Sequence, residues 1–175
     1  KGFLVSGLNA GIKNQTKKDM AMVFSSTPCA AAGVFTTNLV KAAPVKWDKE
    51  IVTTSPYVQA VVVNSGIANA CTGAEGLGYC ADTSAGVIGK QLPIDKIKSG
   101  VTALSKVLGS SREDAKLAAE AIMTTDTKSK EVACTLELDG KQVTVAGMCK
   151  GSGMIHPNMC TMLCFVTTDV AISHE

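Results

Sequence analysis

The sequence predicts a single α+β domain with a layered αββα arrangement. Two observations support this: strand-type runs gather near both ends of the 175-residue chain, and two amphipathic helical stretches follow one another between them. Strands and helices that are segregated along a chain are typical of α+β folds, whereas regular alternation would indicate a parallel sheet. The length suits one domain, or one half of a larger protein.

The first expected strands lie at residues 20–24 and 33–37, separated by Pro28 and a patch of small residues. Residues 57–66, YVQAVVVNSG, form a near-continuous apolar run that Asn-Ser-Gly ends. Such a run is typical of a strand buried on both faces, so we expect it at the centre of the sheet.

A stretch rich in glycine and other small residues follows at residues 76–89. The glycines of TGAEGLG, which overlaps its start, have the order G-x-x-G-x-G, whereas dinucleotide-binding turns need G-x-G-x-x-G. The stretch therefore does not favour nucleotide binding, although its small residues allow close approach to other backbone.

Two helices are expected at residues 93–108 and 113–123. The first begins at Pro93, which suits an opening helical turn, and places apolar residues at close to helical spacing. The second follows Ser110 and Glu113, which have the S-x-x-E spacing of a capping box. Two such helices in succession should cover one face of a sheet.

A hairpin is expected next. Residues 131–138 and 141–148 alternate apolar and polar side chains, and Asp139-Gly140 joins them in the manner of a type I′ turn. The second arm leads to Lys150 and then to GSGMIHPNMCTMLCF at 151–165, a stiff loop that runs into what we expect to be a buried strand.

Composition narrows the class of partner. The 17 basic and 15 acidic residues give a net charge of +2, and only 4% of residues are aromatic, so neither nucleic acid nor an anionic membrane is favoured. No apolar run approaches the ~20 residues of a membrane helix. A small molecule or a protein is the expected partner.

The seven cysteines show no CxxC pair and no Cys/His ligand spacing. We interpret them as reduced, mostly buried residues of a cytoplasmic protein, with metal binding as the alternative. No metal site is predicted.

Thr161 stands where the stiff loop meets the expected strand, a common way to fix one side chain for chemistry. A Thr hydroxyl can be activated by the α-amino group of the same residue once the preceding bond, here Cys160–Thr161, is cut. In that cleavage the hydroxyl attacks the Cys160 carbonyl, and water opens the resulting ester. The alternative is an ordinary loop before a strand in which Thr is common.

Residues 148–169, MCKGSGMIHPNMCTMLCFVTTD, closely resemble the signature of the ornithine acetyltransferase family, the glutamate N-acetyltransferases of arginine biosynthesis. The family pattern is Lys-Gly-x-Gly-Met-Ile-x-Pro-Asn-Met-Ala-Thr-Met-Leu, and this chain departs from it only in having Cys160 for Ala. Further similar blocks keep the family's order across nearly the whole chain: AGIKNQTKKDMAMVFSSTPCAAAGVFTTN, VVVNSGIANACTGAEGLG, GVIGKQLPIDKI and AIMTTDT.

The resemblance implies a DmpA/ornithine-acetyltransferase-like fold and a precursor that cuts itself between Cys160 and Thr161. Residues 1–175 would then be the N-terminal half and the start of the second half. Thr161 would carry an acetyl group from N2-acetylornithine to glutamate in a ping-pong reaction without a cofactor, although some family members also accept acetyl-CoA. The implied partner is the C-terminal half, in a heterotetramer of two alpha and two beta chains, and residues 1–175 alone should be inactive.

Two residues are carried over from the family as substrate contacts: Thr127 of AIMTTDT and Lys150 of KGSGM. An ammonium is a suitable partner for an amino-acid carboxylate. The alternatives are a helix C-terminal turn residue for Thr127 and a surface lysine for Lys150. Asp126 is interpreted as a local hydrogen-bonding residue.

The match breaks at the family's oxyanion hole, a Thr-Gly pair in Ser-Thr-Gly-(Val/Leu)-Ile-Gly. This chain reads SAGVIG at 84–89, so Gly86 keeps its backbone N–H but Ala85 lacks the hydroxyl. Loss of one oxyanion donor typically costs about 10²–10³ in rate. Slow cleavage, slow transfer or both are therefore expected, unless a water molecule or Ser84 replaces the missing donor.

Two other functions stay open. The fold could serve as a non-catalytic interaction or regulatory subunit, with Ala85 as the trace of lost activity. It could also be an N-terminal-nucleophile amidase or aminopeptidase. A transferase needs an amine acceptor, a hydrolase releases its product without one, and a non-catalytic subunit does neither.

Overall fold

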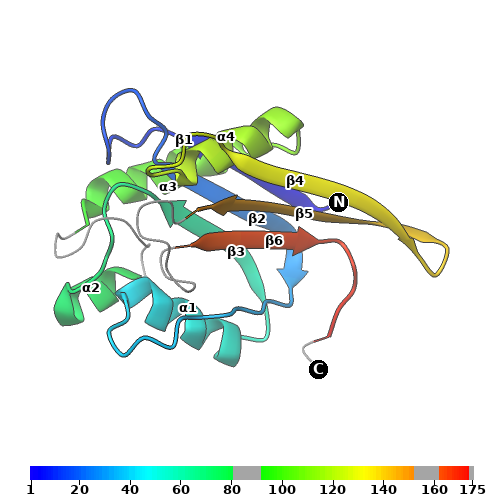
Figure 1. The fold of residues 1–175 in the computed structure, drawn as a ribbon, viewed down its shortest axis with the longest axis horizontal. Helices are drawn as coiled ribbons and strands as arrows, with labels where there is room; N and C mark the ends of the chain where they lie inside the picture. Colours follow the sequence, from blue (N-terminus) through cyan, green and yellow to red (C-terminus); the bar gives the residue numbers. More distant parts are fainter. Residues whose placement is uncertain (81–91, 152–161, 174–175) are drawn as a thin grey trace.

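A computed structural model describes residues 1–80, 92–151 and 162–173. Its strands form two antiparallel three-stranded sheets, ordered β1-β2-β3 and β4-β5-β6 (Figure 1). The strands are β1 (Phe3–Leu8), β2 (Met20–Cys29), β3 (Val58–Asn64), β4 (Lys130–Leu138), β5 (Lys141–Lys150) and β6 (Leu163–Thr168). The helices are α1 (Ala43–Thr54), α2 (Gly73–Cys80), α3 (Ile94–Val107) and α4 (Arg112–Ile122). This order of elements confirms the α+β class.

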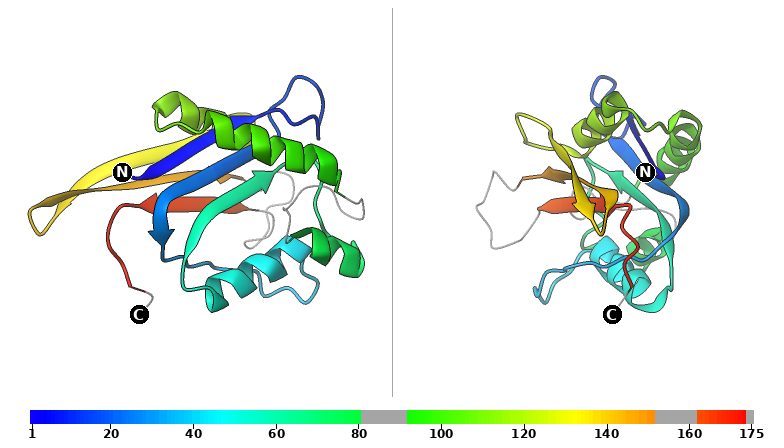
Figure 2. Two further views of the ribbon diagram at one scale, coloured as in Figure 1. Left: turned by 180° about the vertical axis from the view of Figure 1, so that it is seen from behind. Right: turned by 90° about the vertical axis from the view of Figure 1, so that its right-hand side faces the viewer.

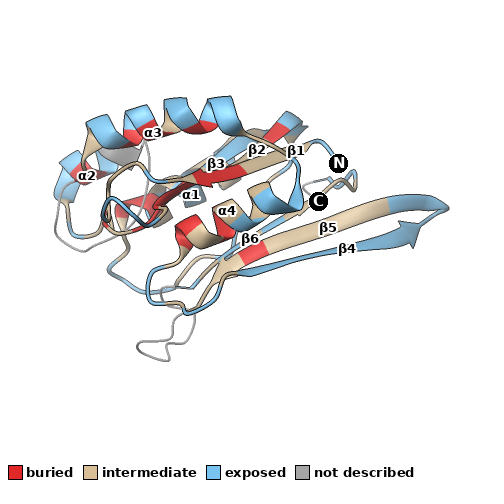
Figure 3. Cartoon of the chain, turned by 90° about the horizontal axis from the view of Figure 1, so that it is seen from above, coloured by how far each residue is buried: buried red, intermediate tan, exposed pale blue. Residues whose placement is uncertain are grey.

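The first sheet is packed on both faces, because successive side chains of a strand point to opposite sides. On one face Met20 and Met22 pack against Ile97 and Leu104 of α3. On the other face the first sheet meets α4 and the inner side of the second sheet, where Met148 of β5 is buried. The layers therefore run from α3 through the first sheet to α4 and the second sheet (Figures 2 and 3). The expectation that the two helices cover one face of a sheet is wrong, because they lie on opposite faces of the first sheet.

Small residues set the distance between the helices and the first sheet. A Cβ atom added to Gly7 of β1 would lie 2.1 Å from the Leu117 carbonyl oxygen of α4. A Cβ added to Gly100 of α3 would lie 2.4 Å from the Met20 sulfur. Both helices consequently sit closer to the sheet than any larger side chain would allow.

Both predicted helices are present, but the capping box is displaced by one residue. Ser111, not Ser110, is the N-cap of α4: its hydroxyl accepts a hydrogen bond from the Asp114 N–H at 3.1 Å. The Asp114 carboxylate in turn accepts from the Ser111 N–H at 2.9 Å. A carboxylate one position further along takes the role expected of Glu113, since Asp is short enough to reach back over this turn.

The N-terminal strands differ from the expectation. β2 continues past Phe24 to Cys29, and residues 33–37 lie outside any strand. β3 is an edge strand of the described sheet rather than its centre, with residues 59–61 exposed. Its β-branched run reflects the preference of such residues for extended backbone, which does not by itself require burial on both faces. The sequence also did not predict β1 or α1.

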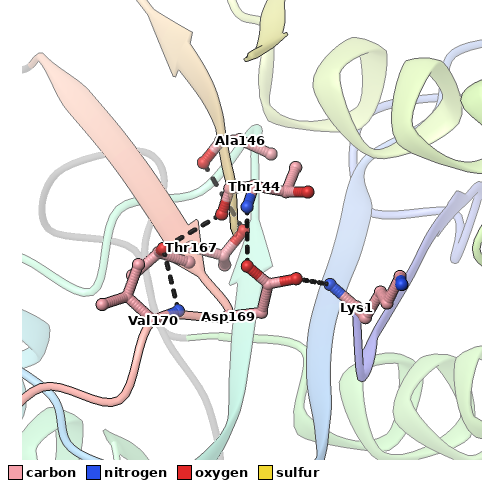
Figure 4. Close-up of polar contacts among 7 residues, drawn as sticks. Lys1, Thr144, Ala146, Thr167, Asp169 and Val170 are labelled. Atoms are coloured by element: carbon pink, nitrogen blue, oxygen red, sulfur yellow. Dashed lines mark hydrogen bonds and ion pairs between the residues drawn. The ribbon is translucent and has the colours of Figure 1, made fainter. Parts of the chain in front are cut away.

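The hairpin is confirmed. Leu138 pairs with Lys141, and both turn residues have positive φ, 49° at Asp139 and 72° at Gly140, as a type I′ turn requires. Asp169 follows β6 at the end of that strand nearer the hairpin turn, where its carboxylate accepts a hydrogen bond from the Thr144 N–H and pairs with the N-terminal ammonium of Lys1, both at 2.6 Å (Figure 4).

Two burial expectations are wrong for the described residues. β6 is only partly buried, with Cys164 and Val166 exposed. Among the described residues, none of the five cysteines at positions 29, 71, 134, 149 and 164 is buried, and Cys71 and Cys134 are also exposed. The physical reason at Cys134 and Cys164 is that no described element covers the outer face of the second sheet. No helix within the described ranges is long and apolar enough to cross a membrane.

Candidate active site

Two of the predicted site residues lie in the described part of the chain, and four do not. Thr127 is exposed in the loop that follows α4, and Lys150 is half-buried at the end of β5. Ala85, Gly86, Cys160 and Thr161 lie outside the described residues.

The described residues that flank the signature stretch lie close together. Lys150, just before the stretch, pairs with Leu163 in the β5–β6 ladder, and Leu163 comes two positions after Thr161 in the sequence. Both described ends of the stretch therefore meet at one end of the second sheet.

Asp126 joins the loop after α4 to the end of β5. Its Oδ1 accepts a hydrogen bond from the Gly151 N–H at 2.9 Å and pairs with Lys130 Nζ at 2.6 Å. Its Oδ2 accepts a longer hydrogen bond, 3.4 Å, from the Thr124 N–H. Since Gly151 follows Lys150 directly, this carboxylate brings the Thr127 loop beside the second predicted substrate contact.

The charge of Asp126 follows from these contacts. Burial raises the pKa of this carboxyl, whose side chain is 4% exposed, but the hydrogen bonds from Lys130, Gly151 and Thr124 outweigh burial and lower the pKa to about 2. Asp126 is thus ionised at neutral pH and acts as a local hydrogen-bond acceptor, which confirms the interpretation from the sequence.

Lys13, in the loop between β1 and β2, reaches the same region from the first sheet. Its ammonium donates to the Met123 carbonyl at the end of α4 and to the Lys18 carbonyl at 3.3 Å. Burial lowers the pKa of Lys13, and the positive charges of Lys17 and Lys150 lower it further. The negative charges of Asp19 and, to a smaller extent, Asp126 raise this pKa but do not outweigh burial. Lys13, Lys150 and Asp126 therefore share one electrostatic neighbourhood.

Sequence reasoning missed Lys13. The available signal was indirect: α4 has no basic residue in its last turn, so a cation that stabilises its C-terminal carbonyls would come from another element.

A separate cavity of about 380 Å³ lies between residues 39–46 and α2. Lys41 and Lys46 line it together with apolar side chains, but Thr127 and Lys150 do not. Among the described residues no three His, Cys, Asp or Glu side chains gather closely enough to hold a metal ion. We therefore place the candidate site at the Thr127 loop and the end of β5, where the contacts above converge.

These features define an α+β protein of two packed antiparallel sheets, with a carboxylate and three lysines gathered where α4 meets β5. The profile of the ArgJ family matches residues 4–83 and 79–175, so the chain belongs to the ArgJ family. The family predicted from the signature is confirmed.

Individual relatives agree with this assignment. The arginine biosynthesis bifunctional protein ArgJ of Thermotoga neapolitana is 46% identical and aligns with 100% of this chain and 48% of its own length. The corresponding protein of Symbiobacterium thermophilum is 49% identical, over 98% of this chain and 47% of its own length. The chain thus spans about half the length of the curated relatives it matches.

Solved structures show the same fold. The crystal structure of the ArgJ protein of Bacillus halodurans has a TM-score of 0.81 at 39% identity, covering 93% of this chain and 92% of that one. The ornithine acetyltransferase of Mycobacterium tuberculosis, complexed with ornithine, has a TM-score of 0.71 at 35% identity, with 93% of each chain covered.

Proposed function

We propose that this chain is the N-terminal half of a glutamate N-acetyltransferase that transfers an acetyl group from N2-acetylornithine to glutamate in arginine biosynthesis. The observation that carries the proposal is the family match over nearly the whole chain. It is supported by relatives named for arginine biosynthesis and by likeness to an ornithine acetyltransferase that holds ornithine.

In this proposal Thr161 is the nucleophile, made N-terminal by cleavage of the Cys160–Thr161 bond. Its free amine, with an ordinary pKa of about 8, accepts the hydroxyl proton as the oxygen attacks the acetyl carbonyl. The bond to the ornithine nitrogen breaks, and that nitrogen takes the proton. The amine of glutamate then attacks the acetyl-Thr ester, which returns the hydroxyl to Thr161 and completes a ping-pong cycle.

Substrate binding is assigned to the described part of the site. Both amino-acid substrates carry an α-carboxylate, for which the Lys150 ammonium is the proposed partner. Thr127 supplies a hydroxyl from the loop that Asp126 ties to Gly151. The proximity of these elements supports one substrate site.

The oxyanion hole is where this chain departs from the family pattern. Gly86 offers a backbone N–H, while Ala85 lacks the hydroxyl that the family pattern supplies, so turnover is expected to be slow. No cofactor is required by the chemistry, and acetyl-CoA as an alternative donor is a further element of the proposal.

The proposed partner is the C-terminal half of the same precursor, in a cytoplasmic heterotetramer of two alpha and two beta chains. Two observations support such a partner. The chain spans about half of its relatives, and the outer face of the second sheet carries exposed apolar side chains. Such a face is typical of a surface that another element covers.

The test uses the full-length precursor and its Thr161→Ala variant. Intact mass should show two fragments that meet at Cys160/Thr161 in the wild type and one uncut chain in the variant. The cleaved protein should then form N-acetylglutamate from N2-acetylornithine only when glutamate is present.

Other outcomes favour the alternatives. Release of acetate without an amine acceptor indicates an amidase-type hydrolase. Uncut wild-type protein without transfer or hydrolysis indicates the non-catalytic subunit, which the alanine at position 85 would explain.

A further inference from the structure

The loop between β1 and β2 holds the backbone of Lys13 in place. Asp19, which is completely buried, accepts hydrogen bonds from the N–H groups of Ala10 and Ile12 at 2.6 Å and of Lys13 at 2.9 Å. Hydrogen bonds from backbone donors to a carboxylate are short and strong. The main chain at Lys13 is therefore fixed independently of any contact by its side chain.

The side chain of Lys13 has a defined path to the end of α4. Gly66, just after β3, has φ of 107°, and a Cβ atom there would lie 2.6 Å from Lys13 Cγ. Only glycine combines this backbone angle with room for the lysine stem. Beyond Gly66 the ammonium donates to the carbonyl of Met123 (the β1–β2 loop and the end of α4 are visible in Figure 1).

The end of α4 offers carbonyl groups that such a donor can satisfy. The last carbonyls of a helix have no partner within the helix and carry partial negative charge. α4 has no basic residue in its last turn, and Met123 is its C-cap. Lys13 thus supplies from the first sheet the cation that the helix does not carry itself.

We propose that Lys13 is a positioning residue for the substrate site, because its hydrogen bond to Met123 fixes the start of the 124–127 loop and so places Thr127 relative to Lys150. The inference rests on the proposed function, in which Thr127 and Lys150 contact substrate. Asp126 holds the same loop to Gly151. The loop is consequently anchored to both sheets.

Hydrogen exchange measured by mass spectrometry on the processed full-length protein tests this role directly. Lys13→Met keeps the length of the side chain but removes its donor. Exchange in residues 124–127 should become about tenfold faster, while residues 112–121 of α4 remain protected. Lys13→Arg, which restores a donor, should return the exchange rate toward the wild-type value.

Steady-state kinetics provide the second measurement. Lys13→Met should raise the KM for N2-acetylornithine about fivefold and change kcat by no more than a factor of about two, since it loosens a binding contact rather than the nucleophile.

Two neighbouring lysines serve as matched controls. Lys17 is exposed on the same loop, and Lys18 pairs with Glu120 of α4 at 2.8 Å without a hydrogen bond from its side chain to Met123. Lys17→Met and Lys18→Met should both leave the exchange of residues 124–127 and the KM unchanged.

Two results would overturn the proposal: unchanged exchange in Lys13→Met, or equal loosening in Lys18→Met, which would indicate a general effect of charge at the helix end. If Lys13→Met does not fold, Lys13→Gln, whose side chain is shorter, is judged by the same criteria. A wild-type protein without acetyl transfer would refute the proposed function, but the exchange comparison would still decide the role of Lys13.

Discussion

The two sheets of the molecule have the same number of strands but very different surroundings. In the first sheet Met20 and Ala21, neighbours on β2 that face opposite ways, are both fully buried. In the second sheet every residue of β4 is exposed, with Val132 at 73%. Figure 3 shows the contrast: buried residues lie along the first sheet and its helices, whereas the β4–β5 hairpin extends away from them.

Strand register explains what the second sheet lacks. Residues paired across neighbouring strands lie on the same face. Val132 pairs with Gly147, which pairs with Val166, and Val166 is 65% exposed. Met148, one residue along β5, faces inward and is buried. The second sheet therefore carries apolar side chains on both faces, of which the described chain covers only part of the inner one.

The described chain therefore contains one finished core, packed on both faces of the first sheet, and one open surface, the outer face of the second sheet. Apolar side chains stabilise a strand when they are removed from water, so identical truncations should have unequal effects in the two sheets.

The largest expected effect is on the finished core. Ile97→Ala should lower the free energy of unfolding of residues 1–175 by about 3 kcal/mol, because it leaves a cavity between α3 and the first sheet. Val132→Ala should lower it by less than about 0.5 kcal/mol. Urea denaturation measures both, and equal losses would show that the two sheets are buried alike.

The next effect concerns the junction between the sheets. Asp126→Asn should lower the free energy of unfolding by about 2 kcal/mol, because the pKa of the Asp126 carboxyl in the folded protein, about 2, lies below the ordinary value of 3.8. A lowered pKa means that the stabilisation is present above pH 3.8 and is lost as the pH falls toward 2. Urea denaturation at several pH values should therefore show an acid-dependent loss in this window that the variant lacks. If Asp126→Asn loses as much stability in this pH window as the wild type does, the Asp126 carboxyl is not the group responsible for the acid-dependent loss.

A smaller effect is expected at the open surface. In the proposed assembly Val132→Asp should weaken the association of the two halves by about tenfold, because it places one unpaired charge at the rim of the interface between them. Thr135→Asp, on the opposite face of the same strand, is the control and should leave association unchanged. Analytical ultracentrifugation compares the two, and equal affinities would place the partner elsewhere.

The smallest effect tests the cap of α4, which contacts both sheets. Ser111→Ala should lower the free energy of unfolding by about 1 kcal/mol, because the Ser111 hydroxyl accepts a hydrogen bond from the Asp114 N–H at the start of α4. Ser110→Ala should cost almost nothing. Thermal melts of the two variants distinguish them, and the reverse order would restore the capping box predicted at Ser110.

The candidate site was only partly predictable. The family blocks single out Thr127 and Lys150, whose role as substrate contacts stays a prediction, whereas the hydrogen-bonding role expected of Asp126 is confirmed. The bond from Lys13 to Met123 joins residues 110 positions apart, so no local pattern could indicate it.

What the sequence determined by itself is the local chemistry: the Asp139-Gly140 turn, the two amphipathic helices, the α+β class and the family signature. These depend on residues close together in the chain, whose backbone preferences act before any tertiary contact forms. Only the tertiary structure decided that β2 rather than β3 is the central strand of the first sheet and that α3 and α4 pack on opposite faces of that sheet. It also decided that Lys13 donates a hydrogen bond to the Met123 carbonyl at the end of α4. Each of these depends on which distant surfaces exclude water from one another, and that is a property of the packed chain as a whole.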